Sequence, residues 1–487
     1  IYQRPFGGHT SNYGEKPVQR ACAAADRTGH ALLHTLYQQN LRAKTKFFVE
    51  WIALDLIRDE AGDVLGVTAI DLETGETAVF QAKCTLFATG GAGRIYAAST
   101  NAFINTGDGL GMAARAGIPL EDMEFWQFHP TGVAGAGVLL TEGCRGEGGL
   151  LRNKNGERFM ERYAPNLKDL APRDFVSRSM DQEIKEGRGC GPNGDYVVLD
   201  LTHLGVETIM KRLPSVYEIG KKFANVDCTK EPIPVVPTIH YQMGGIPTNI
   251  NGQVVVPKDG NPNSIVKGLY AIGECSCVSV HGANRLGASA LMQGLADGYF
   301  VIPYTIGNYL ADEIATKPIP TTHEAFETAE KAVSDRITRL MNIKGSKSVE
   351  SFHKRLGKIM WEKCGMARNE KGLTEAISEI QALRKEFWND VRIPGIINEM
   401  NPELDKAGRV ADFMELGELM CRDALNRKES CGGHFREESQ TEEGEAKRDD
   451  ANFTFVSAWE YKSESNWEMH KEELIFEVAK PTQRSYK

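Results

Sequence analysis

Residues 269–292 read LYAIGECSCVSVHGANRLGASALM, and this stretch decides the fold. Its first four residues form a short apolar run that Gly273 closes, a pattern that predicts a buried strand ending in a turn. From Ser289 onward the sequence is compatible with a helix, which we expect to end at Pro303. A strand, a glycine turn and a helix N-terminus present backbone N–H groups and a helix dipole to an anionic or electron-rich ligand. We therefore expect a ligand site here, with Arg285 beside it.

The composition is that of a globular chain with more than one domain. Of its 487 residues, 41% are hydrophobic and 25% are charged. No stretch reaches the roughly 20 uninterrupted apolar residues that a membrane-spanning helix needs, so we expect any membrane link to run through a partner. The net charge is −9 and the basic residues are scattered among acids, so we expect no nucleic acid partner.

The ten cysteines indicate a reducing compartment and no metal centre. They fall at irregular spacings without a CxxC pair, so neither a zinc ribbon nor an iron–sulfur motif is present. Cys275 and Cys277 form a CxC pair, which we interpret as two small apolar fillers beside a buried turn. A redox role for this pair is the alternative.

A second glycine-rich loop lies earlier in the chain. Residues 47–91 hold three β-rich runs separated by the turn formers DEAGD and ETGE, which predicts an antiparallel meander. The third run ends at Gly90 and Gly91 in the loop ATGGAG, and a glycine-rich helix start follows at residues 105–117. This order indicates a phosphate or ribose loop of the dinucleotide-binding type.

Changes of pattern along the chain predict several domains. The region after residue 120 is dense in Gly, Pro, Arg and aromatic residues, which indicates an inserted domain rich in ordered loops. The strand, turn and helix signature returns from about residue 243, so we expect the first domain to be split.

The last third of the chain is predicted to be helical and then short-stranded. Apolar residues recur at three and four positions between 323 and 430, which predicts a bundle of three or four helices. The recurring positions are Leu373, Ile377, Ile380, Leu383 and Phe387, and later Val410, Phe413, Leu416 and Met420. The charged stretch 434–450 is predicted to be a solvated loop, and residues 452–461 are strand-like.

Four fragments carry the reactive side chains. They are WQFHPT (126–131), TEGCRGEG (141–148), APRDF around Arg173, and TIHY (238–241). With Arg285 they supply two histidines and three arginines, a set suited to clamping a small dianion. Arginine pairs bidentately with a carboxylate, and histidine donates from one ring nitrogen while a neighbour orients the other.

Each of these residues also has a purely structural interpretation. His129 before Pro130 could cap a turn, and His240 could be a hydrogen-bonded core histidine. Arg173 could form a surface ion pair with Asp174. The five residues identify a site only if they converge in space.

The combination of motifs is far more specific than any one of them. WQFHPTG, LLTEGCRGEGG, APRD, PTIHYQMGGIPT, GLYAIGE and HGANRLG, in this order and at these spacings, resemble the flavoprotein subunit of succinate dehydrogenase and fumarate reductase. The likeness runs from PFGG near the start to the FREESQ and RDD region near the end, so it covers nearly all of the chain.

The resemblance implies an α/β fold with four parts. They are a split FAD-binding, Rossmann-like domain (1–120 and 243–310), an inserted α+β capping domain (121–242), a helical bundle domain (311–430) and a small C-terminal domain (431–487).

The resemblance also implies roles for individual residues. It matches His129, Thr141, His240 and Arg285 to the dicarboxylate ligands, Arg173 to the acid/base arginine, Glu142 and Arg145 to its proton relay, and Phe6 to an aromatic residue near the substrate. It matches Asp108, Glu274 and the helix start at Ser289, Ala290 and Leu291 to FAD-contacting positions, alongside the loop glycines Gly90 and Gly91.

The sequence departs from the family pattern in two places. It begins at Ile1 without the family's first GxGxxG strand and without the histidine that links covalently to FAD. By the size of a βαβ unit and its loops we expect on the order of a hundred residues to precede it in a longer protein. The second departure is GASAL (287–291), where many members read GGNSL. We expect Ser289 and Ala290 to be tolerated, because the contacts there are largely backbone N–H groups.

The implied activity is oxidation of succinate to fumarate, or the reverse. A hydride passes between substrate and FAD while Arg173 moves a proton, and the electrons go to an iron–sulfur subunit and a membrane anchor that binds quinone. The expected location is peripheral, on the cytoplasmic face of a bacterial inner membrane or the matrix face of the mitochondrial one. The alternatives are a soluble flavoenzyme like L-aspartate oxidase and a truncated assembly chain without enzymatic activity.

Overall fold

The computed structural model describes residues 1–12, 15–478 and 480–482. Its central sheet joins segments that are far apart in the sequence. Strand β6 (Thr85–Phe87) pairs in parallel with β14 (Asn261–Ala271), and the other edge of β14 pairs with β13 (Gln253–Lys258). Ala271 lies opposite Phe87, so β6 and β14 end at the same edge of the sheet. The loops that follow these two strands therefore lie side by side, which is where open parallel sheets bind ligands.

The predicted meander is present, with one correction. Strands β3 (Trp51–Arg58), β4 (Val64–Asp71) and β5 (Thr77–Gln81) form an antiparallel sheet in that order. The third β-rich run was expected to be one strand, but it divides after Gln81, and its second half is β6 of the central sheet. Because both halves are apolar and β-branched, hydrophobic pattern alone does not reveal the change of sheet.

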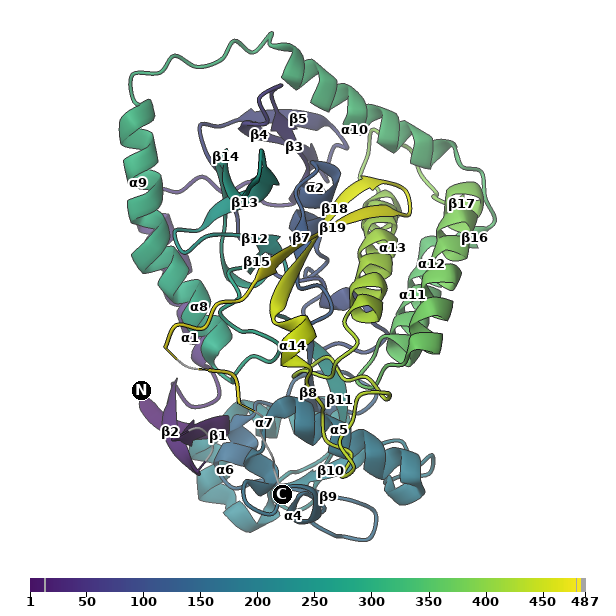
Figure 1. Cartoon of the computed structure of the whole chain (residues 1–487). Coiled ribbons are helices and arrows are strands. Elements are labelled where there is room, and N and C mark those ends of the chain that lie inside the picture. Colours follow the sequence, from purple (N-terminus) through teal and green to yellow (C-terminus); the bar gives the residue numbers. More distant parts are fainter. Residues whose placement is uncertain (13–14, 479, 483–487) are drawn as a thin grey trace.

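A second sheet fills the lower part of the molecule in Figure 1. It is antiparallel, and its strand order is β8 (Trp126–Val133), β11 (Ile233–Gln242), β10 (Val197–Asp200) and β9 (Leu150–Arg152). Its apolar core, which includes Leu151, Val176 and Val235, is distinct from the main core of the molecule. Helix α5 (Arg173–Glu183) packs against β8.

Short elements surround this second sheet. The hairpin of β1 (Tyr2–Ser11) and β2 (Lys16–Ala23) contacts α3 (Gly143–Gly146), and the other short helices of this part are α4 (Met160–Tyr163), α6 (Val206–Arg212) and α7 (Pro214–Ile219). Elsewhere β12 (Ile246–Pro247) pairs with β15 (Ser276–Cys277), and β16 (Lys347–Ser348) pairs with β17 (Val391–Arg392).

The predicted helical bundle is confirmed. Helices α11 (Val349–Lys363), α12 (Glu370–Asp390) and α13 (Pro402–Asn426) pack on one another, and α10 (Glu324–Asn342) lies mainly on strands β3 and β5 with a smaller contact to α13. The periodic apolar residues of α12 and α13 are buried in the main core, with Ile377 partly buried. Side-chain caps start the last two helices: Asn369 accepts from Gly372 N–H (2.7 Å) and Asn401 from Leu404 N–H (3.1 Å).

The helix that begins at Ser289 does not end at Pro303 as expected. Helix α8 (Ser289–Ala296) runs through a π-helical turn (Asp297–Val301) into α9 (Ile302–Glu313). Pro303 lies in the first turn of α9, where proline is tolerated because its missing N–H is not needed.

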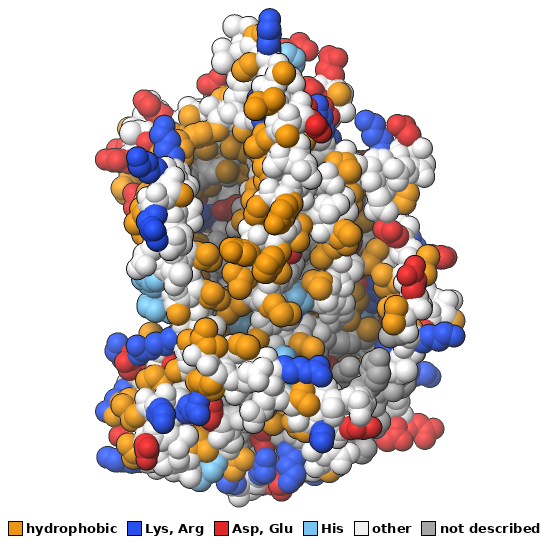
Figure 2. All heavy atoms as spheres, turned by 90° about the vertical axis from the view of Figure 1, so that its left-hand side faces the viewer, with side chains coloured by type: hydrophobic (Ala, Val, Ile, Leu, Met, Phe, Trp, Pro, Cys, Tyr) orange, Lys and Arg blue, Asp and Glu red, His pale blue; other side chains and the backbone are white. Residues whose placement is uncertain are grey.

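An apolar face extends along α8 and α9 on the side of the molecule that Figure 2 turns toward the viewer. It includes the exposed side chains of Met292, Tyr299, Phe300 and Tyr304. Helix α1 (Thr28–Arg42) adds the exposed side chains of Leu33, Leu36 and Tyr37.

The C-terminal region completes the fold. Strand β18 (Phe455–Ser463), which confirms the strand predicted there, pairs with β19 (Asn466–Glu473) and with β7 (Leu120–Glu121), and the short helix α14 (Asp450–Phe453) precedes it. The charged stretch before it is a loop, as expected, but its first residues, His434 to Arg436, are buried. Among the described helices, none has the length and hydropathy needed to cross a membrane.

Candidate active site

The two predicted histidines are brought together by an irregularity in the second sheet. On β8, Gln127 and His129 share one face, while Trp126 and Phe128 face the main core. The pairing of β8 with β11 steps from Ile239 directly to Tyr241, so His240 is the extra residue of a β-bulge. The bulge places the His240 ring 4.9 Å from the His129 ring, centroid to centroid.

Both rings are neutral hydrogen-bonding groups. His129 Nδ1 accepts from the Thr131 N–H (3.1 Å), so in the neutral ring Nε2 carries the proton. His240 Nδ1 lies 2.8 Å from Thr100 Oγ1. Burial, followed by the charges of nearby arginines such as Arg173, holds the pKa of each ring well below its usual value. The interpretation of His129 as a turn cap is wrong, because it lies within a strand.

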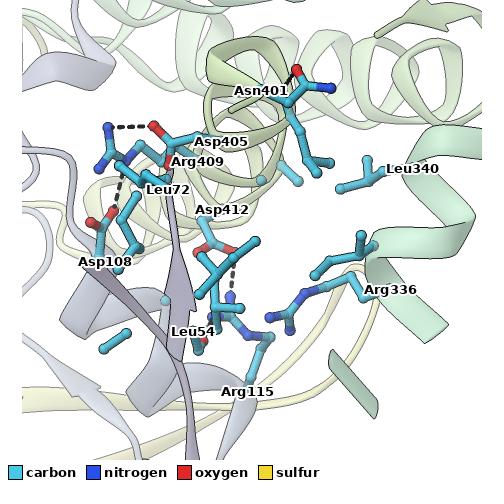
Figure 3. A pocket seen from close by; sticks show the side chains of 18 of the residues that line it. Leu54, Leu72, Asp108, Arg115, Arg336, Leu340, Asn401, Asp405, Arg409 and Asp412 are labelled. Carbon is cyan, nitrogen blue, oxygen red and sulfur yellow. Dashed lines mark hydrogen bonds and ion pairs between the residues drawn. The ribbon is translucent and has the colours of Figure 1, made fainter. Parts of the chain in front are cut away.

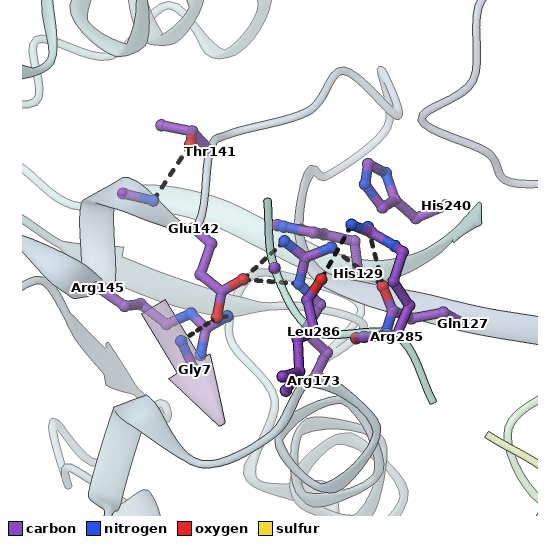
Figure 4. A network of polar contacts seen from close by, with 12 residues as sticks. Gly7, Gln127, His129, Thr141, Glu142, Arg145, Arg173, His240, Arg285 and Leu286 are labelled. Carbon is purple, nitrogen blue, oxygen red and sulfur yellow. Dashed lines mark hydrogen bonds and ion pairs between the residues drawn. The ribbon is translucent and has the colours of Figure 1, made fainter. Parts of the chain in front are cut away.

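A buried carboxylate links two of the predicted arginines (Figure 4). Arg173 opens α5 and donates from Nε to Glu142 Oε2 (2.7 Å), with its Nη2 2.6 Å from the same oxygen. Arg145 Nη2 lies 3.3 Å from Glu142 Oε1, which also accepts from the Gly7 N–H (2.6 Å). Burial alone would raise the pKa of Glu142, but the two arginines and the Gly7 N–H hold it below its usual value. Glu142 is therefore ionised, and Arg173 is not in the surface pair with Asp174 considered above.

Arg285 reaches the same cluster from the loop before α8. Its Nη2 donates to Gln127 Oε1 (3.1 Å), and its guanidinium carbon lies 4.3 Å from the centre of the Tyr241 ring. The side chain is buried, and its Nε has no partner among the described residues. Burial, followed by the charge of Arg173, lowers the pKa of Arg285 to about 9, so it remains a cation at neutral pH. An unpaired, buried guanidinium N–H is a donor available to an anion.

Thr141 lies at the edge of the cluster, and Phe6 adjoins it along the chain through Gly7. Thr141 immediately precedes Glu142, and its Oγ1 accepts from the Gly143 N–H (3.1 Å). Phe6 and Gly7 are neighbours on β1. The same strand carries His9, whose Nε2 lies 2.9 Å from the carbonyl oxygen of Gly287. The N-terminal hairpin thus contacts the loop that carries Arg285.

Sequence reasoning missed Gln127, which contacts both Arg173 and Arg285. It also missed Gly7, where a Cβ would clash with Glu142. Gln127 could have been found from its spacing, because it stands two residues before His129 and residues two apart share a face in a strand. Gly7 carried no comparable signal.

The glycine-rich loops form a second group of site residues. Glu274 accepts from the Gln242 N–H (3.1 Å), and a Cβ on Gly91 would lie 2.7 Å from Glu274 Oε1. Gly90 has φ 72°, a conformation that favours glycine. Burial raises the pKa of Glu274 to about 7. The Glu274 side chain therefore packs directly against the glycine loop.

The start of α8 lies next to the arginine cluster along the chain. The N–H groups of its first turn, from Ser289 to Leu291, lack intrahelical partners by the geometry of a helix start. Ala288, the residue before it, adopts φ 69°, which is strained for a residue with a Cβ. Of the three positions that differ from GGNSL, Ala288 is therefore the one with a strained backbone, and Ser289 and Ala290 are not.

Asp108 lies apart from the arginines, at the start of α2 (Asp108–Arg115). It accepts from Thr106 Oγ1 (2.9 Å), lies 3.5 Å from Arg409 Nε, and has a pKa raised by burial. The N–H of Gly107 donates to the Gly91 carbonyl (3.2 Å), so Asp108 adjoins the glycine loop. Asp108 also lines a cavity of about 220 Å³ between the meander and helices α2, α10 and α13 (Figure 3).

Comparison with known proteins agrees with this geometry. Residues 1–291 match the family model described as "FAD binding domain", and residues 353–486 match "Fumarate reductase flavoprotein C-term". The chain is 45% identical over 456 residues to the succinate dehydrogenase flavoprotein subunit of Coxiella burnetii, covering 93% of this chain and 75% of that one. The chain belongs to the family of succinate dehydrogenase and fumarate reductase flavoprotein subunits.

Further members of this flavoprotein family are similarly close. The mitochondrial succinate dehydrogenase flavoprotein subunit of Oryza sativa is 44% identical over 481 residues, which is 98% of this chain and 72% of that one. A mutant of E. coli quinol fumarate reductase has a TM-score of 0.87 at 36% identity, covering 99% of this chain and 80% of that one. A quinol–fumarate reductase with menaquinol has a TM-score of 0.85 and 36% identity, covering 98% and 80%.

The predicted fold class and the resemblance to this flavoprotein family are both confirmed by these matches. The prediction of FAD as cofactor is confirmed by the match of residues 1–291 to an FAD-binding domain. The match of the C-terminal third to the fumarate reductase flavoprotein does not favour an L-aspartate oxidase.

Proposed function

We propose that this flavoprotein subunit interconverts succinate and fumarate with bound FAD. The observation that carries the proposal is the convergence of Arg145, Arg173 and Arg285 with His129 and His240 in one cluster, where Glu142 is the only carboxylate of the described residues that pairs with these arginines. Such a cluster is suited to a dicarboxylate, because guanidinium forks and imidazole N–H groups are strong donors to carboxylates.

In this proposal the substrate carboxylates are bound by Arg285, His129, His240 and Thr141, with Phe6 near the substrate. Arg285 offers its unpartnered Nε, and the neutral histidines donate without adding charge. Holding both ends of the substrate fixes its central carbon–carbon bond, which supplies orientation as well as affinity.

Arg173 is the proposed acid and base for the substrate carbon that exchanges a proton. Its guanidinium donates a hydrogen bond to Glu142, and Glu142 forms an ion pair with Arg145, so the three side chains form a continuous chain of charged contacts. Arg145 Nη1 also donates to the Asp169 carbonyl (2.5 Å). Glu142 and Arg145 are therefore the proposed relay that restores the proton of Arg173 after each turnover.

FAD, when bound, accepts the hydride from succinate or returns it to fumarate. Its proposed contacts are Gly90, Gly91, Asp108, Glu274, Ser289, Ala290 and Leu291. The match of residues 1–291 to an FAD-binding domain supports this assignment. Covalent attachment of FAD through a histidine is part of the proposal, and the intact mass of the native protein tests it.

The proposal extends to partners, location and domain limits. Electrons are expected to pass to an iron–sulfur subunit and then to quinone in a membrane anchor, with this chain peripheral on the cytoplasmic or matrix face. Relatives named as quinol–fumarate reductases support this. The domains of the proposal are 1–120 with 243–310, 121–242, 311–430 and 431–487.

The direct test is the flavin spectrum of the native holoprotein under anaerobic conditions. Succinate is expected to bleach the oxidised flavin, and fumarate is expected to restore the colour after chemical reduction. Bleaching by L-aspartate without a response to succinate would instead favour the oxidase. A protein without flavin absorbance would favour the assembly chain.

Arg285→Lys is expected to weaken succinate binding although it keeps the positive charge. A lysine ammonium cannot reproduce the fork that contacts Gln127, stacks on Tyr241 and leaves Nε for the ligand. We expect KM to rise about tenfold to a hundredfold, the scale of a lost charge-assisted hydrogen bond. Steady-state kinetics with FAD content checked by absorbance decides it, and an unchanged KM would remove Arg285 from the substrate contacts.

A further inference from the structure

Gln127 occupies the centre of the cluster and has no role in the function proposed above. Its side chain is fully buried on β8 (Figure 4). Its Oε1 accepts from Arg173 Nη1 (3.0 Å) and from Arg285 Nη2 (3.1 Å). One neutral oxygen therefore holds the tips of two guanidinium groups that would otherwise repel each other.

The orientation of the Gln127 amide is set by its other contacts. Nε2 donates to Asn284 Oδ1 (2.8 Å) and to the carbonyl oxygen of Arg285 (2.5 Å). Asn284 in turn donates to Asp174 Oδ1 (2.6 Å). A flipped amide would turn its NH₂ group toward two cations, so the network admits one orientation.

The charge of the cluster matches a dianion when this residue is neutral. Among the described residues, Glu142 is the only carboxylate that pairs with Arg145, Arg173 or Arg285, and His129 and His240 are neutral, so these six side chains together carry two net positive charges. Glu274 and Asp169 act on Arg285 and Arg145 from outside this set. A carboxylate in place of the Gln127 amide would pair with both Arg173 and Arg285 and remove one of these charges.

We infer that Gln127 is a positioning residue that spaces Arg173 and Arg285 and, by being neutral, makes the site selective for dianions over monoanions. This inference rests on the proposed function and adds its charge selectivity. Gln127 acts through the two arginines, so no contact with substrate is required of it.

Gln127→Glu tests the charge part of the inference. An added negative charge opposes a dianion twice as strongly as a monoanion at the same place. We expect the affinity for malonate to fall about a hundredfold and that for propionate about tenfold, so the preference for malonate narrows about tenfold. A general loss of structure would lower both affinities by the same factor. The measurement is competitive inhibition of succinate oxidation by each ligand in the native holoprotein.

Gln127→Met tests the spacing part, because methionine is similar in size, uncharged and lacks the amide acceptor. We expect the preference for malonate over propionate to be retained, while turnover falls about a hundredfold because Arg173 is no longer held in place. Gln182→Glu is the matched control, because it adds the same charge on an exposed turn of α5, where the partner of Gln182 is Glu186. It should change neither the ratio of malonate to propionate affinity nor the turnover.

The outcomes separate this inference from the proposed function. A wild-type holoprotein that neither binds malonate nor oxidises succinate would overturn the proposed function itself. A functional wild type whose Gln127→Glu variant keeps the full preference for malonate would overturn the charge selectivity alone. If the Gln127→Glu variant retains no flavin, the test passes to the Gln127→Met variant. Normal turnover in Gln127→Met would overturn the role of Gln127 in positioning Arg173.

Discussion

Arg173→Gln is expected to lose turnover about a thousandfold or more in both directions while dicarboxylate binding is largely kept, because the proton transfer disappears and the other carboxylate ligands remain. Arg173 is the only guanidinium of the described cluster that contacts both Glu142 and Gln127. In this position Arg173 can receive a proton from Glu142, while the contact with Gln127 keeps its guanidinium group oriented. Steady-state turnover and malonate titration on the same preparation measure the two effects separately.

The competing interpretation is that Arg173 is a third carboxylate clamp. Arg173→Lys would then raise KM more than it lowers turnover. The matched control is Arg178→Gln on the same helix, since Arg178 pairs with Asp174 (3.0 Å) and does not contact Glu142 or Gln127 in the described network. A variant of Arg173 that turns over normally once saturated with succinate would contradict proton transfer by this residue.

Glu142→Gln is expected to lower turnover about a hundredfold and to destabilise the fold by about 3 kcal/mol. Its side chain is fully buried and is the counter-charge of Arg173 and Arg145. The amide removes the ionised carrier of the relay and leaves two buried guanidinium groups without their anion. Malonate affinity should hold or rise, because the site becomes more positive. Turnover, malonate inhibition and denaturant unfolding measure the three effects.

The control for Glu142 is Glu147→Gln, which removes a carboxylate from the same segment. Glu147 lies 3.5 Å from Arg4 and is outside the path from Arg173 to Arg145. We expect it to keep turnover within about threefold, as for an exposed or partly exposed ion pair. A Glu142→Gln enzyme with the turnover of this control would show that the relay runs through other groups.

The sequence predicted best those helices and strands that can be recognised from their own residues, without knowledge of what they pack against. The meander follows from β-rich runs separated by turn formers, and the helical bundle follows from apolar residues that recur at three and four positions and so record which face of a helix is buried. The same reasoning placed the helix end wrongly at Pro303, because a π-helical turn puts this proline in the first turn of a new helix.

The site was predicted less completely than the fold. Its arginines and histidines could be named from motifs, but their convergence depends on the bulge at His240 and on loops from both sheets. Gln127 was missed because a glutamine between two aromatic residues carries no chemical signal of its own, and only its spacing from His129 points to the site. Its importance appears only when two guanidinium groups are seen to share its oxygen.

Product analysis of the native complex tests the central claim most directly. Incubated with fumarate and a reduced dye, the protein should form succinate, and with succinate and an oxidised dye it should form fumarate, both identified by NMR. Malonate should inhibit both reactions, and L-aspartate should remain unchanged. Flavin-loaded protein that forms neither product, or that consumes L-aspartate in their place, would contradict the assignment of the arginine and histidine cluster to succinate and fumarate.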